Sequence, residues 1–178
     1  MSSTMNSDSI SFVSRWLNKA DNYNTEELSE CFDQFFSLFV AYNRIYSEVK
    51  LQLKETDSGD KVSATKNIYI FLRKKGQKNL TAILPQDEYN NVIRMIEDEM
   101  YWIDLDNEGR RQREKDLQLL KNLKSNGPKK KTIAILTTIY YVRCNLFHGN
   151  KEFIQYQKPL LTSLSKILKA IINELLRH

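Results

Sequence analysis

Apolar residues recur at helical spacing along most of this chain, and short breaks that contain glycine, proline or charged residues separate the apolar stretches. Gly59 and Gly76 lie in two of these breaks, and residues 125–128 (Ser-Asn-Gly-Pro) form another. The pattern predicts helices over residues 9–19, 26–54, 62–74, 86–102, 117–123, 129–149 and 159–176. It indicates an all-α fold, and no P-loop, Rossmann or repeat pattern interrupts it.

Residues 133–142 have a rival interpretation, because they are rich in the β-branched and aromatic residues that favour strands. Their continuation to Phe147 along one apolar stripe favours a helix. We therefore predict a single helical domain over residues 1–178, with residues 1–9 flexible. Asn24 or Thr25 is the expected cap of the long helix over residues 26–54.

This long helix carries a broad stripe of large rings: Phe32, Phe35, Phe36, Phe39, Tyr42 and Tyr46. An aromatic stripe at helical spacing is typical of core packing or of a dimer face, and less typical of a platform for stacking bases. It leaves open a structural role, in which the chain is an adaptor that joins partner proteins through this face.

The length of 178 residues suits one domain with a substantial core. The polar N-terminus lacks the basic-then-apolar plan of a secretory leader, and no apolar run approaches the roughly 20 residues that cross a bilayer. Cys31 and Cys144 lie far apart and form no metal-ligand pattern. We expect a soluble, cytoplasmic protein with free thiols, without a metal or another cofactor and without a membrane partner.

Charge is distributed unevenly along the chain. Residues 1–60 hold five Lys/Arg and ten Asp/Glu, whereas residues 61–178 hold 22 Lys/Arg and 12 Asp/Glu. Basic clusters occur within residues 73–75, 110–113 and 129–131. A polyanion such as RNA would favour this half through its phosphates, although each cluster taken alone is also typical of a solvated helix end or loop.

Arg143 and His148 stand near the end of the predicted helix over residues 129–149. Arg143 falls on the apolar stripe, so it points into a core, an interface or a ligand pocket, because an unpaired buried charge is costly. Its guanidinium suits phosphate, and His148 can exchange a proton near neutral pH. Five residues of ideal helix leave the two side chains about 140° apart, so the last turn must unwind at Gly149 if they are to meet in one chain.

The segment from Arg143 to Gly149, with the apolar pair Leu146-Phe147 before the histidine, resembles the HEPN superfamily (higher eukaryote and prokaryote nucleotide-binding domains). The resemblance implies an up-and-down helical bundle with extra helices, in which the motif-bearing helices cover about residues 129–178. It also implies a metal-independent endoribonuclease, and a homodimer whose two motifs line one cleft. By the same resemblance the protein would be a toxin or antiviral defence effector, with an antitoxin or regulatory protein as partner.

In this ribonuclease hypothesis the catalytic residues are Arg143, His148 and Asn145. His148 acts as general base or acid, Arg143 stabilises the phosphorane, and Asn145 orients the histidine or the phosphate. The basic residues expected to bind RNA are Lys129, Lys130, Lys131 and Lys151.

The main alternative is a non-catalytic HEPN-like module that binds RNA, a nucleotide or a protein. Cys144 favours it, because the family usually has a polar residue directly after the arginine. Arg143 would then hold a phosphate or a buried carboxylate, and His148 would lie at a helix C-terminus, where a cation is favourable.

Overall fold

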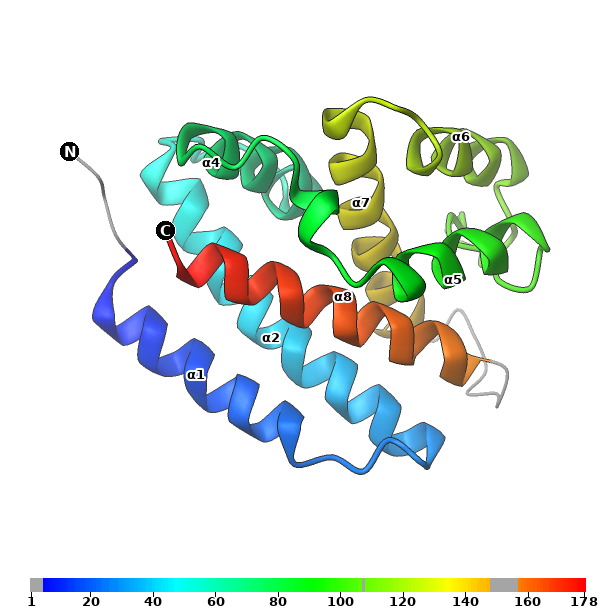
Figure 1. The fold of residues 1–178 in the computed structure, drawn as a ribbon, viewed down its shortest axis with the longest axis horizontal. Helices are drawn as coiled ribbons and strands as arrows, with labels where there is room; N and C mark the ends of the chain where they lie inside the picture. Colours follow the sequence, from blue (N-terminus) through cyan, green and yellow to red (C-terminus); the bar gives the residue numbers. More distant parts are fainter. Residues whose placement is uncertain (1–4, 107, 148–156) are drawn as a thin grey trace.

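The computed structural model describes residues 5–106, 108–147 and 157–178, and within these ranges the protein is all-helical (Figure 1). The prediction of an all-α fold is confirmed. The described residues contain no strand, and their one β-bridge joins Leu105 to Arg111 in a loop. No helix among them is both long enough and apolar enough to pass through a bilayer.

Three long helices lie side by side: α1 (Ser7–Asp21), α2 (Leu28–Gln52) and α8 (Lys158–Leu176) (Figure 1). The long α2 packs against both α1 and α8, so the aromatic stripe predicted along it supplies much of the core. Phe35 and Tyr42 are fully buried there. As expected, Pro159 lies in the first turn of α8, where its missing N–H has no helical partner to lose.

The next helical segment is continuous but not uniform. It begins as α3 (Asp60–Val62), widens into a π-helical turn (η1, Ser63–Asn67) and continues as α4 (Ile68–Lys74). The hydroxyl of Tyr42 donates to the carbonyl oxygen of Ala64 inside this turn at 2.5 Å. A buried tyrosine of α2 thus anchors the turn to the core.

The remaining helices are α5 (Gln86–Glu97), α6 (Arg113–Leu123) and α7 (Pro128–Phe147), and a short 3₁₀ turn (Leu80–Ile83) precedes them. α5 packs against α8, and α7 contacts α6, α4 and the π turn. The strand alternative for residues 133–142 is excluded, because all of them lie in α7.

The helix predicted over residues 86–102 ends earlier than expected. α5 stops at Glu97, and Glu99 takes a positive φ of 55°. Beyond it burial alternates: Tyr101 and Ile103 are buried, whereas Met100 and Trp102 are exposed. Every second apolar residue after Glu97 therefore enters the core, as in an extended segment. The sequence pattern wrongly predicted that the helix continues through this segment.

The N-terminal part of the chain also differs from expectation. Residues 7–9, expected within a flexible extension, form the first turn of α1, and Met5 is buried. The side chain of Asn6 caps this helix, and its backbone N–H donates to Glu48 at 2.6 Å. The predicted cap of α2 is wrong as well: Glu27 occupies that position without a side-chain hydrogen bond.

Candidate active site

Arg143 lies on α7 four residues before the end of the helix, and aromatic rings hold its guanidinium. The central guanidinium carbon is 5.3 Å from the ring centroid of Phe39 and 4.9 Å from that of Phe147. Its Nη1 donates to Sγ of Cys144 at 3.9 Å, while its buried Nε has no hydrogen-bond partner among the described residues. Ring faces attract a cation without neutralising it, so this arginine retains positive charge and donor capacity for an anion.

The ring of Phe147 connects this arginine to a wider aromatic cluster. It stacks on Phe36 with 5.1 Å between the ring centroids, and it lies 6.2 Å from Phe32. Phe36 in turn meets Trp16 of α1 edge to face. Phe147 is 40% exposed, so the cluster reaches the surface next to the arginine.

Three further polar residues, Tyr46, Asp60 and Tyr140, interact with Arg143 or with one another, and sequence analysis did not select them as site residues. The hydroxyl of Tyr46 donates to Oδ1 of Asp60 at 2.8 Å, and burial raises the pKa of this tyrosine, an effect that the Arg143 charge opposes. Burial, with the nearby Cys144 and Asp60, also raises the pKa of Tyr140. Both phenols therefore remain protonated at neutral pH and act as donors, not bases. Tyr140 could have been found from the sequence, because it precedes Arg143 by three residues on the same helix face.

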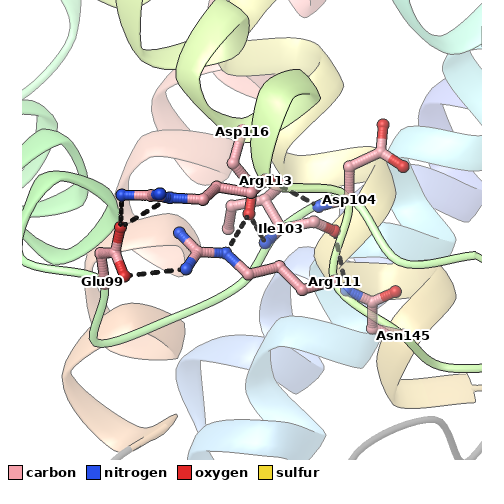
Figure 2. A network of polar contacts seen from close by, with 7 residues as sticks. All are labelled: Glu99, Ile103, Asp104, Arg111, Arg113, Asp116 and Asn145. Atoms are coloured by element: carbon pink, nitrogen blue, oxygen red, sulfur yellow. Dashed lines mark hydrogen bonds and ion pairs between the residues drawn. The ribbon is translucent and has the colours of Figure 1, made fainter.

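Asn145 faces a different part of the molecule from Arg143. It is buried, and its Nδ2 donates to the carbonyl oxygen of Ile103 at 2.9 Å (Figure 2). Two residues of helix rotate a side chain by about 200°, which explains why positions 143 and 145 point to opposite sides of α7. The donor of Asn145 thus anchors the segment after α5, while its predicted catalytic role stays a prediction.

That segment is organised around the buried carboxylate of Asp116. The backbone N–H groups of Ile103 and Asp104 donate to it at 3.4 and 2.8 Å, and Nε of Arg111 lies 3.5 Å away (Figure 2). Burial raises the pKa of Asp116, and the two backbone donors and Arg111 act against that rise. The carboxylate binds the loop to α6 through several partners at once.

The predicted basic cluster within residues 110–113 belongs to this network. Arg111 and Arg113 both pair with Glu99, at 2.9 and 3.2 Å, and Arg110 pairs with Asp106 at 2.9 Å. Each of these guanidinium groups therefore has a carboxylate beside it. The neighbouring carboxylates lower the positive potential that the cluster offers to an external polyanion.

The lysines expected to bind RNA lie at the other end of α7 from Arg143. Lys129 and Lys130 are exposed, and Lys131 is half-buried. The 14 residues from Lys129 to Arg143 span about 20 Å of helix, so these lysines do not share a site with the arginine. His148 and Lys151, the other predicted site residues, lie outside the described residues.

Comparisons of the chain with protein-family models, with curated proteins and with solved structures give no match. The functional argument therefore rests on the chain itself.

Proposed function

We propose that this protein is a metal-independent endoribonuclease of the HEPN type. The observation that carries the proposal is the state of Arg143: a half-buried guanidinium held by two rings, with no carboxylate paired to it among the described residues. In the sequence this arginine opens the motif that His148 completes. The all-α architecture agrees with the fold class that the family requires, and an up-and-down HEPN-like bundle is part of the proposal.

The chemistry we propose is transfer within RNA. His148, as general base, takes the proton of a ribose 2′-hydroxyl, whose oxygen attacks the adjacent phosphorus. Arg143 stabilises the negative charge that builds on the phosphorane. The bond to the 5′-oxygen then breaks, and this oxygen takes a proton from a general acid. The products are a 2′,3′-cyclic phosphate and a 5′-hydroxyl, and DNA is not cut.

A homodimer would supply the general acid from a second copy of His148 across a twofold axis. In this proposal the enzyme is a toxin or defence effector whose activity a partner protein restrains.

The test is cleavage of mixed tRNA, rRNA and mRNA in EDTA by the wild type, by Arg143→Ala and by His148→Ala. We expect only the wild type to cut, leaving 2′,3′-cyclic ends, and each variant to lose at least about a hundredfold in rate. Lys121→Ala is the matched control: this lysine of α6 is exposed and forms no ion pair within the described residues, so the variant should cleave normally. Equal cleavage by all four proteins would reject the proposed centre.

A non-catalytic RNA- or nucleotide-binding module is the second candidate. The engagement of Asn145 with Ile103 favours it, because the amide donor predicted to orient the histidine or phosphate is already used. Cys144 favours it too, because it stands where the family usually has a polar residue, and its Sγ accepts a hydrogen bond from Arg143. This candidate predicts RNA binding without cleavage by the wild type, and binding weakened by Arg143→Ala.

A further inference from the structure

A hollow lies away from Arg143, between the first turns of α7 and the segment formed by the π turn and α4. Here the surface is hollowed into a groove of about 560 Å³, a volume within the range of roughly 300–1,000 Å³ typical of small-molecule sites. The groove is lined by Lys66, Tyr69, Ile70, Arg73, Lys74, Lys129 and Ile133. Its residues come from two segments more than fifty positions apart in the sequence.

The charge of this groove is of one sign. Four of the lining side chains are cationic and none is a carboxylate. Within the described ranges, none of these four cations forms an ion pair, and Nζ of Lys129 lies 6.0 Å from the ring centroid of Tyr69. Four unneutralised cations around one hollow raise its positive potential, so an anion that enters it is stabilised.

The floor of the groove is apolar and partly open. Tyr69 is half-buried, and Ile70 is 38% exposed. Together with Ile133 of α7 they give the groove an apolar part of its lining. Aromatic and apolar surface beside a row of cations is the arrangement with which proteins bind single nucleotides of a strand, because the base stacks while the phosphates meet the charges.

We propose that the α4–α7 groove is a nucleotide-binding site, in which a base packs against Tyr69 and the phosphates lie among Lys66, Arg73, Lys74 and Lys129. The nucleotide belongs either to a single-stranded RNA or to a free nucleoside triphosphate, and both present the same chemistry to the groove. The site does not depend on cleavage at Arg143, because about 20 Å of α7 separates the two.

The experiment measures binding of a fluorescein-labelled 12-nucleotide uridine RNA by polarisation, at several salt concentrations. All proteins carry Arg143→Ala, so that no RNA is cut. We expect the affinity to fall with salt with a logarithmic slope of about −3, the value for four phosphates on a single strand. The double charge reversal Lys66→Glu/Lys129→Glu should weaken binding at least about tenfold and reduce the slope by about half.

The matched control is Arg15→Glu/Lys121→Glu, which makes the same charge change at two exposed positions that do not line the groove. It should bind almost as tightly as the protein with the intact groove. Tyr69→Ala should weaken binding about tenfold with the slope unchanged, whereas Tyr69→Phe should retain it, because stacking needs the ring and not the hydroxyl. Circular dichroism establishes that each variant is folded.

Competition with ATP distinguishes the two sources of the nucleotide. Displacement of the labelled RNA by ATP at lower concentration than by unlabelled 12-mer would assign the groove to a free triphosphate, and the reverse order would assign it to a strand. The proposal is overturned if the parent protein binds neither probe at low salt, or if the groove reversal and its control weaken binding equally. Ribonuclease activity is measured separately on the protein with Arg143 intact, so failure of one proposal leaves the other standing.

Discussion

Two groups of basic side chains, one within residues 110–113 and one around the α4–α7 groove, have different surroundings in the folded chain. Each of the three arginines at the start of α6 and in the loop before it lies beside a carboxylate, Glu99 or Asp106. The cations between α4 and α7 have no such neighbour within the described residues. The difference shows that a run of Lys and Arg indicates a binding surface only when tertiary structure keeps acids away from it. The paired arginines help to hold the loop to α6, whereas the unpaired cations of the groove keep their charge for interaction with an anion.

The largest loss of stability should come from removing the buried carboxylate beside the paired arginines. Asp116→Ala removes the acceptor of two buried backbone N–H groups and one of the two carboxylate partners of Arg111. We expect the free energy of unfolding to fall by about 3 kcal/mol, as for other buried pairs that lose one member. Urea denaturation measures it. Glu114→Ala, at an exposed position of the same helix, is the control and should change little.

Asn145→Ala should have the next largest effect. It removes the hydrogen bond that joins α7 to the carbonyl of Ile103 and leaves that buried oxygen without this donor. The expected loss is about 2 kcal/mol of unfolding free energy, against almost none for Asn90→Ala, an exposed asparagine of α5. A variant as stable as the wild type would mean that Asn145 is not structural, which would strengthen its predicted catalytic role.

Removing charged groups from the α4–α7 groove should have almost no effect on the stability of the fold. Lys66→Gln/Lys129→Gln removes two cations that repel each other and pair with no acid among the described residues. We expect the melting temperature to stay constant or rise slightly, corresponding to less than about 0.5 kcal/mol. A clear loss of stability would show that these lysines have a structural partner and would remove the contrast between the two clusters.

The smallest expected effect is a shift in the pKa of one carboxyl group, that of Glu99. The hydrogen bond from Arg111, with the charges of Arg111 and Arg113, holds the pKa of Glu99 below its ordinary value of 4.5. Since the folded-state pKa is lowered, these pairs stabilise the fold above the ordinary pKa, and that stabilisation is lost as pH falls through the lowered value. NMR titration should place the midpoint of Glu99 below 4.5 and move it upward in Arg111→Gln. Arg110→Gln, whose guanidinium pairs elsewhere, should leave it in place.

The sequence predicted what depends on local periodicity. The helices over α2, α7 and α8 were predictable because their apolar residues recur on one face, and Pro128 and Pro159 stand where helices begin. The end of α5 was not, because Met100 and Trp102 continue the helical pattern in the sequence, whereas the structure exposes them and buries Tyr101 and Ile103.

The candidate sites were predictable only in part. Arg143 was selected because a charge on an apolar stripe needs an explanation, and the structure shows that rings surround it. The pairing of Arg111 with Glu99, and the position of Lys66 and Lys129 around one groove, depend on how separate elements pack. No local pattern specifies such contacts, so charge was visible in the sequence but its neutralisation was not.

The π turn over residues 63–67 has a consequence for the groove. Such a turn accommodates one residue more than an α-helical turn, so every later side chain is rotated by about 100° relative to an uninterrupted helix. With that rotation, Tyr69 and Arg73 line the same groove as Lys129. Deleting one residue from the turn would leave the helix and its cations present, yet swing Tyr69 and Arg73 out of line with α7. The groove therefore depends on the direction in which the π turn orients the side chains of α4, as well as on the number of lysines around it.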